Sequence, residues 1–256
     1  MQENIKDLID KFNKVKKLGW VKNERKGTSG IGYTFEKLIG KEEDNFYLPD
    51  FQGIEIKTKK HFSKGYLTLF NLTPDGDYLF PIEYIRNKYG YKDKIITNQK
   101  IFQYTITNKY RCFFKDNLFN LKVNYDNEKV ILEIVNMLDY SKDTSISWSF
   151  KEIKERLYNK MPYLAIIKAN IEEKNDVEYI KYYDIKIYKL KDFSTFLKLI
   201  ENGTIRITFK IGVFHSGTRI GQVHDHGTGF DIHEDDLNML FEQINIYKKW
   251  DYNLIM

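Results

Sequence analysis

Two acids and a lysine, Asp50, Glu55 and Lys57, stand close together in the stretch LPDFQGIEIKTKK, residues 48–60, which otherwise reads as a hydrophobic strand. Side chains alternate faces along a strand, so Glu55 and Lys57 point the same way, and a short glycine-containing segment lets Asp50 turn toward them. Two carboxylates and the backbone carbonyl of Ile56 form an oxygen donor set that suits a hard divalent cation such as Mg²⁺. A lysine beside such a cation can orient an attacking water. The stretch therefore predicts a metal-dependent hydrolytic site.

The spacing is Pro-Asp, four residues, then Glu-x-Lys, which is the PD-(D/E)xK pattern of many nucleases. Alone the pattern is weak, because a half-solvated edge strand with alternating charges reads the same way. Glu36 strengthens it, since it lies on the polar side of a helix expected at 33–39, where it can complete an acidic cluster or position a metal-bound water. A solvated helix glutamate is the alternative.

A second constellation is FHSGTRIGQVHDHGTGF, near the end of the chain. Four of the five histidines fall between His215 and His233, with Arg219 and Lys210 nearby. A hairpin of this composition can offer hydrogen-bonding groups to base edges in the major groove. Two imidazoles spaced two apart in HDH also suit a metal site. A polar surface hairpin without a role is the third interpretation.

Composition sets the context for both constellations. The net charge of +5 with a pI near 8.9 permits a polyanionic partner without requiring one. The single cysteine, Cys112, excludes an internal disulfide and suits a reducing compartment as a buried packing residue. No apolar run approaches the roughly 20 residues needed to cross a bilayer, and the N-terminus shows no export signal. We expect an intracellular protein.

The elements that must position these residues follow from hydrophobic periodicity. Gly19 and Gly40 mark the ends of the first two helices, and PYLAIIKANIE is apolar enough for a central strand. Expected helices cover 4–18, 33–39, 147–161, 191–203 and 233–244. Expected strands cover 54–57, 66–74, 100–115, 121–135 with a turn at 126–127, 162–172 and 177–190, and a long glycine-bearing hairpin or meander covers 204–233. The pattern predicts a mixed α/β chain with two lobes.

Together these pieces resemble one family, the MvaI/BcnI group of type II restriction endonucleases, relatives of the MutH mismatch-repair nickase. The matching segments are LGWVKNERKGTSGIGYTFEKLIGKEEDNFYLPDFQGIEIKTK, TLF at 68–70, RNKYG at 86–90, WSF at 148–150 and IGVFHSGTRIGQVHDHGTGF. The resemblance implies an α/β, MutH-like restriction-endonuclease fold: a mixed sheet flanked by helices, with two lobes around a DNA cleft. The expected lobes of this single unit, 1–256, are a catalytic lobe, 1–165, and a recognition lobe, 166–256.

By the same resemblance the catalytic residues are Asp50, Glu55, Lys57, Glu36 and Lys160, with Asp50, Glu55 and the carbonyl of Ile56 holding the metal. The implied cofactor is Mg²⁺, with Mn²⁺ able to substitute and Ca²⁺ supporting binding without cleavage. The implied partner is double-stranded DNA, cut by a monomer one strand at a time at a short CCNGG-like site. No membrane and no obligate protein partner are expected. The expected setting is the bacterial cytoplasm, with a DNA methyltransferase encoded separately.

Residues implied to contact DNA are Lys26, Thr28, Lys210, His215, Arg219, His224, Asp225, His226 and Asp231. Lys210 and Asp231 stand where the resemblance leads us to expect arginine. Neither residue reproduces the two-pronged donor fork of a guanidinium. The resemblance therefore supports the catalytic residues more firmly than the bases that are read.

Three rival functions remain open at this level. A MutH-like repair nickase uses the same chemistry but cuts one strand, so it leaves nicked circles without linear product. A DNA-binding protein with a structural acidic strand shows no Mg²⁺-dependent cleavage. A histidine-metal oxygenase retains iron or zinc and loses it on His224→Ala.

Overall fold

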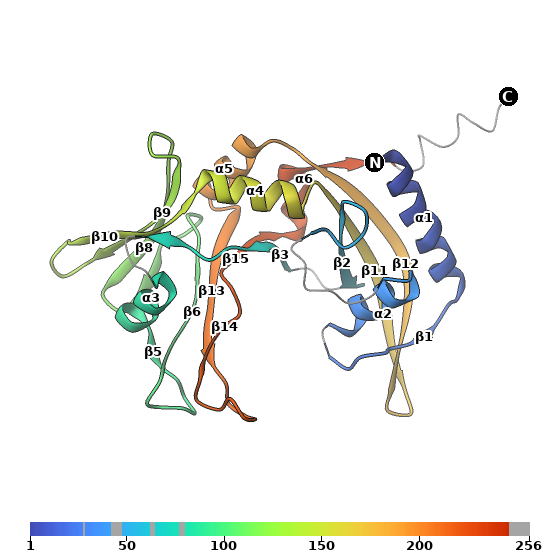
Figure 1. Ribbon diagram of the computed structural model, residues 1–256, viewed down its shortest axis with the longest axis horizontal. Coiled ribbons are helices and arrows are strands. Elements are labelled where there is room, and N and C mark those ends of the chain that lie inside the picture. The colour runs from blue at the N-terminus through green and yellow to red at the C-terminus, as the bar shows by residue number, and fades with distance from the viewer. Residues whose placement is uncertain (28, 42–47, 62–64, 77–79, 246–256) are drawn as a thin grey trace. The chain divides into compact units, whose positions relative to one another are not determined.

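The computed structural model describes residues 1–256 apart from 28, 42–47, 62–64, 77–79 and 246–256 (Figure 1). The chain forms two compact units. Unit 1 comprises 1–64, 158–191 and 241–256, and unit 2 comprises 65–157 and 192–240. This grouping differs from a single boundary at residue 165, because strands from both halves of the chain pair in one sheet of unit 1.

Unit 1 is built on a mixed sheet in the order β1-β12-β11-β2, with β16 also paired to β12. Its strands are β1 (Val21–Lys22), β2 (Ile54–Lys60), β11 (Tyr163–Lys174), β12 (Val177–Leu190) and β16 (Phe241–Ile244). β11 pairs in parallel with β2 and antiparallel with β12. The prediction that this apolar strand is central is confirmed. β2 lies at the end of the order, so one of its edges has no strand partner among the described residues.

Two helices cover the core side of this sheet, α1 (Gln2–Lys17) against β12 and α2 (Gly30–Leu38) against β2. Leu8 and Phe12 of α1 and Phe35 of α2 are buried with Ile54 and Ile56 of β2 in one cluster. The apolar spacing of both predicted helices is the pattern that these contacts require. Since Ile54 and Ile56 face the helices, the residue between them faces the opposite side of β2.

Unit 2 contains two antiparallel sheets. One runs β4-β10-β9-β8-β7, with β4 (Asp75–Gly76), β7 (Cys112–Phe114), β8 (Asn117–Asn124), β9 (Lys129–Asn136) and β10 (Lys142–Ser149). The other runs β3-β15-β13-β6-β5 with β14 paired to β13, and comprises β3 (Tyr66–Asn71), β5 (Tyr91–Lys92), β6 (Lys100–Ile106), β13 (Ile205–Val213), β14 (Val223–Asp225) and β15 (Gly229–His233). Its helices are α3 (Pro81–Tyr89), α5 (Phe193–Glu201) and α6 (Leu237–Leu240), with a 3-10 turn at Glu234–Asp236. The predicted hairpin or meander at 204–233 is confirmed as β13–β15.

Two predicted helices differ in extent from those observed. The helix expected at 147–161 begins only at Phe150, as α4 (Phe150–Lys160), because Ser147–Ser149 belongs to β10. Trp148 there is fully buried, and its indole N–H donates to the carbonyl of Leu72 at 3.0 Å. The helix expected at 233–244 is shorter still, since its last residues form β16 against the free edge of β12. In both places tertiary pairing overrides a helical periodicity.

Two smaller expectations can also be checked. Cys112 is buried, with 3% of its surface exposed, as predicted for a packing residue of a strand, and it is a free thiol, as expected of a single cysteine. Within the described residues, none of the helices has both the length and the apolar character that spanning a membrane requires.

Candidate active site

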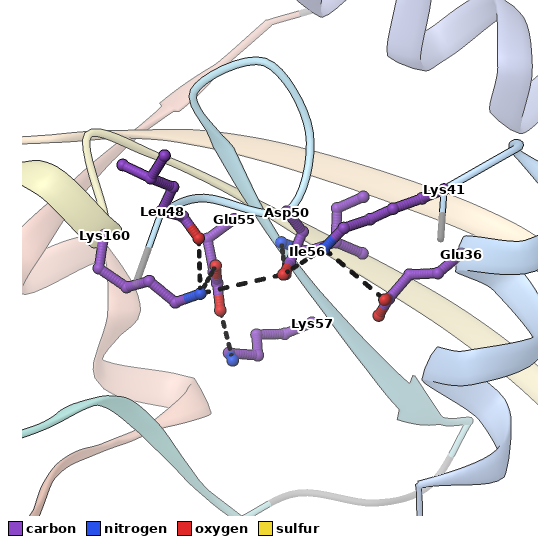
Figure 2. A network of polar contacts seen from close by, with 8 residues as sticks. All are labelled: Glu36, Lys41, Leu48, Asp50, Glu55, Ile56, Lys57 and Lys160. Carbon is purple, nitrogen blue, oxygen red and sulfur yellow. Dashed lines mark hydrogen bonds and ion pairs between the residues drawn. The ribbon is translucent and has the colours of Figure 1, made fainter. Parts of the chain in front are cut away.

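Glu55 and Lys57 lie on the same face of β2, as the strand alternation predicted. The ammonium of Lys57 lies 2.6 Å from Oε1 of Glu55 (Figure 2). The Glu55 side chain is only 1% exposed, whereas that of Lys57 is 33% exposed. A carboxylate so deeply buried requires nearby positive charge or hydrogen-bond donors. Lys57, two residues further along the strand, supplies part of this positive charge.

A tight turn returns Asp50 to the open edge of β2. The backbone N–H and carbonyl of Phe51 exchange hydrogen bonds with those of Ile54, and the two residues between them, Gln52 and Gly53, have φ values of 44° and 88°. Two positive φ values are typical of the hairpin turn in which glycine favours the second position. As a result, Oδ2 of Asp50 accepts the backbone N–H of Ile56 at 2.9 Å.

Lys160 reaches this site from the end of α4. Its ammonium lies 2.8 Å from Oε2 of Glu55 and 3.9 Å from Oδ1 of Asp50, and it donates to the carbonyl of Leu48 at 3.0 Å. Two residues separate Lys160 from the start of β11, and β11 runs parallel to β2 with Leu164 opposite Glu55. Because the two strands run in the same direction, their first residues lie side by side. The end of α4, which precedes β11, therefore lies near the start of β2, where Asp50 and Glu55 are found.

Lys41 joins the site from the other side, and no sequence pattern identified it. Its ammonium donates to Oδ1 of Asp50 at 3.0 Å and lies 3.8 Å from Oε2 of Glu36. Figure 2 shows Lys41 reaching between the two acids. Glu36 thus lies near Asp50, but the two acids meet through the ammonium of Lys41.

The electrostatics of the three carboxyl groups differ. Burial raises the pKa of Glu36, and the negative charge of Asp50 raises it further. Burial also raises the pKa of Glu55, and the ammonium of Lys57 only partly offsets this. For Asp50 burial acts in the same direction, but the N–H of Ile56 and the ammoniums of Lys160 and Lys41 outweigh it and hold its pKa below the usual range. Asp50 is therefore the most firmly ionised of the three acids.

The donor atoms fit a hard divalent cation. The N–H of Ile56 faces away from β11 toward Asp50, and a strand residue's carbonyl points to the same side as its N–H, so the Ile56 carbonyl also faces the open edge. Carboxylate oxygens of Asp50 and Glu55 with this carbonyl make the all-oxygen set that Mg²⁺ prefers. No three-membered His, Cys, Asp or Glu group able to hold a metal occurs among the described residues. Glu36 accordingly does not complete a three-acid cluster.

The hairpin residues that the resemblance implies to contact DNA belong to unit 2. Two of them, Asp231 and Lys210, contact side chains of neighbouring strands in the same sheet. Asp231 of β15 is 4% exposed and accepts hydrogen bonds from Thr68 at 2.6 Å and Thr208 at 2.7 Å. Lys210 of β13 lies 3.4 Å from the hydroxyl of Thr68, above Gly229, where a side chain would meet its ammonium. In this structure Asp231 therefore organises its neighbours and is not presented outward to a base.

The remaining hairpin residues form a ring stack. The imidazole of His224 stacks on Phe214 with centroids 4.4 Å apart, and His226 meets His224 edge-on at 3.9 Å. The guanidinium of Arg219 lies 4.1 Å from the centre of the Phe214 ring. Asp225 accepts the N–H of Gly227 at 2.9 Å, which shapes the turn that follows. The stack gives the predicted cluster a fixed shape.

His215 is oriented by a residue that the sequence did not single out. Its Nε2 lies 3.0 and 3.1 Å from the two carboxylate oxygens of Asp93, which is 5% exposed. Asp93 also accepts the N–H groups of Ile95 and Ile96. The pair thus ties the loop after β5 to the loop after β13. A lone Asp in a lysine-rich loop carries no sequence signal for this contact.

The glycine-rich loop before α2 is only partly described. Lys26 is exposed there, beside Arg25, whose guanidinium lies 3.8 Å from the ring centre of Tyr33. Thr28, also implied to approach DNA, lies outside the described residues. Gly30 allows the carbonyl of Arg25 to approach the start of α2, since a Cβ there would lie 2.0 Å from that oxygen.

Comparison with known proteins gives this arrangement a family. The family model described as the MvaI/BcnI restriction endonuclease family matches residues 9–241. The chain belongs to the MvaI/BcnI restriction endonuclease family. Family membership of this kind identifies a site-specific nuclease. The predicted family is confirmed.

Solved structures agree with the family. The structure titled "Restriction endonuclease MvaI-cognate DNA substrate complex" has a TM-score of 0.85 and 34% identity, covering 95% of this chain and 98% of that one. "Restriction endonuclease MvaI in the absence of DNA" gives a TM-score of 0.61 and 32% identity over the same shares. The predicted mixed α/β class is thereby confirmed. Among curated proteins, none matches this chain.

Proposed function

We propose that this protein is a type II restriction endonuclease that hydrolyses phosphodiester bonds of double-stranded DNA with Mg²⁺ as cofactor. The observation that carries the proposal is the convergence of Asp50, Glu55 and Lys57 on the open edge of β2, in a chain whose family consists of restriction endonucleases. The DNA complex of a relative at 34% identity adds support for the substrate.

Some residues of the site bind the cation, and others position the attacking water and the carboxylates. Asp50 and Glu55, with the carbonyl of Ile56, hold the cation, which when bound supplies a water of lowered pKa and stabilises charge developing on the phosphate. Lys57, the more exposed of the two lysines beside Glu55, orients the attacking water. Lys160 holds the Glu55 carboxylate toward the site. Hydrolysis in line with the 3′ oxygen leaves 5′-phosphate ends.

Recognition belongs to the unit 2 hairpin in this proposal. His224, His226 and Arg219 offer polar groups on a ring stack of fixed shape, which suits the reading of base edges. We infer a monomer that nicks each strand in turn at a short, nearly palindromic CCNGG-like site. The setting is a bacterial cytoplasm in which a separately encoded methyltransferase protects the host DNA. Mn²⁺ substitutes for Mg²⁺ in this account, and Ca²⁺ supports binding without cleavage.

Digestion of a fully sequenced supercoiled plasmid with Mg²⁺, followed by sequencing of the fragment ends, tests the proposal. Discrete linear fragments with one common end sequence are expected. Stable nicked circles without linear product would favour the MutH-like nickase instead, and intact plasmid under all metal conditions would overturn both. The end sequences also give the recognition site.

Two substitutions locate the chemistry. Asp50→Ala and Lys57→Ala abolish cleavage but retain site-specific DNA binding in Ca²⁺, measured by fluorescence anisotropy with a duplex carrying the site. Asp10→Ala removes an exposed acid of α1 in the same unit and is the matched control. Full activity of either site variant contradicts the assignment of catalysis to this edge of β2.

A further inference from the structure

The two carboxylate oxygens of Asp50 have different partners. Oδ2 is held by the backbone N–H of Ile56 at 2.9 Å, a contact that fixes the turn before β2. Oδ1 is the oxygen left for a cation, and the ammonium of Lys41 lies 3.0 Å from it, closer than that of Lys160 at 3.9 Å. A divalent cation bound to Oδ1 and the ammonium of Lys41 therefore require the same oxygen.

The end of α2 places Lys41 in this position. Gly40 adopts a left-handed φ of 81°, the N–H of Lys41 donates to the carbonyl of Glu36 at 2.9 Å, and the N–H of Gly40 donates to that of Lys37 at 3.1 Å. These paired bonds are the glycine-dependent helix ending that reverses the chain. The reversal directs Lys41 toward Asp50, where its side chain is only 16% exposed.

Acids and lysines are equal in number at the site among the described residues. Three carboxylates there, Glu36, Asp50 and Glu55, meet three ammoniums, Lys41, Lys57 and Lys160. Adding a divalent cation to this poorly exposed cluster brings two further positive charges close to the lysines. Since charges interact more strongly away from bulk water, an ammonium nearest the cation is driven from its carboxylate.

We propose that Lys41 is the internal counter-ion of Asp50 and that a divalent cation binds by displacing the Lys41 ammonium from Oδ1. The displaced ammonium keeps Glu36 as its partner, because both belong to the same helix end and already lie 3.8 Å apart. Lys41 is thus a positioning residue that holds the Asp50 carboxylate in place between catalytic cycles. The proposal rests on the proposed function, since it concerns the cation that the site binds.

Ca²⁺ binding to the full-length protein without DNA, measured by calorimetry, tests the displacement. Lys41→Gln removes the competing ammonium and binds Ca²⁺ about fivefold or more tightly, a coupling at the lower end of the usual range for linked sites. Lys37→Gln makes the same charge change on the same helix, where Lys37 pairs with Glu24, and changes the dissociation constant less than twofold. Lys41→Arg presents a two-pronged donor to Asp50 and binds Ca²⁺ more weakly than the wild type.

Thermal unfolding supplies a readout that is independent of affinity and activity. In EDTA the Lys41→Gln protein melts at a lower temperature than the wild type, because the Asp50 carboxylate loses the ammonium that lies 3.0 Å from its Oδ1. Saturating Ca²⁺ raises its melting temperature by more than it raises that of the wild type. An equal rise in both proteins contradicts the displacement.

The two proposals fail in distinguishable ways. If Lys41→Gln binds Ca²⁺ with unchanged or lower affinity while the wild type still cleaves DNA with Mg²⁺, only the role of Lys41 is wrong. If the wild type neither binds Ca²⁺ nor cleaves DNA, the metal-dependent function itself is wrong. Opposite shifts for Lys41→Gln and Lys41→Arg, with Lys37→Gln unchanged, establish the competition.

Discussion

The ammonium nitrogen of Lys160 lies 2.8 Å from Oε2 of Glu55 and thereby connects the end of α4 to the edge strand β2. Glu55 is 1% exposed, and its other oxygen contacts Lys57. Two lysines from distant parts of the sequence thus share one buried carboxylate. Because each lysine contacts a different oxygen of Glu55, the loss of Lys160 can be tested separately from that of Lys57.

Lys160→Met leaves Oε2 of Glu55 buried without its ion-pair partner. Leaving a buried polar group without its partner costs about 1–3 kcal/mol of the free energy of unfolding. We expect cleavage to fall about 100-fold as well, the scale of a misplaced catalytic group. Urea unfolding and single-turnover cleavage check the two effects, with Lys154→Met, an exposed lysine of α4, as the control. Unchanged stability and rate would remove Lys160 from the site.

Gly40→Ala tests how the helix ending positions Lys41. In the part of the chain that the structure describes, no atom lies within 4 Å of a Cβ at Gly40, so the cost is backbone strain at its left-handed φ, roughly 1 kcal/mol. Gly19→Ala is a matched control, since Gly19 has a φ of 71°, equally open surroundings and no contact with the site. Both variants lose similar stability, but only Gly40→Ala changes the Ca²⁺ dissociation constant. Equal Ca²⁺ affinities would show that this turn does not place Lys41.

Asp93→Ala tests the link between two loops of unit 2. The substitution releases His215 and the N–H groups of Ile95 and Ile96. If the hairpin reads bases, binding to the cognate duplex in Ca²⁺ weakens roughly tenfold while binding to unrelated duplex changes little. Competition anisotropy separates the two affinities. Asp126→Ala, at an exposed turn of the same unit, leaves both unchanged, and a uniform loss on both duplexes would argue against a role in recognition.

Asp143 makes the stability of unit 2 depend on pH. Burial opposes its ionisation, but hydrogen bonds from Ser145, Tyr84 and Tyr89 and the ammonium of Lys88 hold its pKa below the usual range. A carboxyl whose folded-state pKa is depressed contributes stability above its unfolded pKa near 4, and this stability is lost as the pH falls toward the folded pKa.

Asp143→Asn therefore destabilises the protein by about 2 kcal/mol at pH 7. The difference from the wild type narrows below about pH 4, because the Asp143 carboxyl of the unfolded wild-type chain takes up a proton there while that of the folded protein is still ionised. Urea unfolding at a series of pH values measures it, with Asp116→Asn, an exposed residue, as the control. A difference that stays constant between pH 7 and pH 3 would mean that the charge of Asp143 contributes no stability.

Much of the candidate site was predictable because its signals are local. The Glu-x-Lys alternation follows from strand geometry, and the Gln52–Gly53 turn that returns Asp50 has a recognisable glycine. The apolar runs of α1, α2 and β11 predicted their positions for the same reason. Periodicity failed where distant pairing decided the outcome, as at Ser147–Ser149 and Phe241–Ile244, which join sheets in place of extending helices.

The sequence by itself determined the donor types, the strand that carries them and, through its family motifs, the class of enzyme. Tertiary structure alone decided which lysine meets which acid: Lys41 at Asp50 through a helix ending, and Lys160 at Glu55 through a parallel pairing. It also decided that Asp231 is buried between Thr68 and Thr208. The physical reason is range, because alternation and turns act over a few residues, whereas charge pairing and burial depend on segments that only the folded chain brings together.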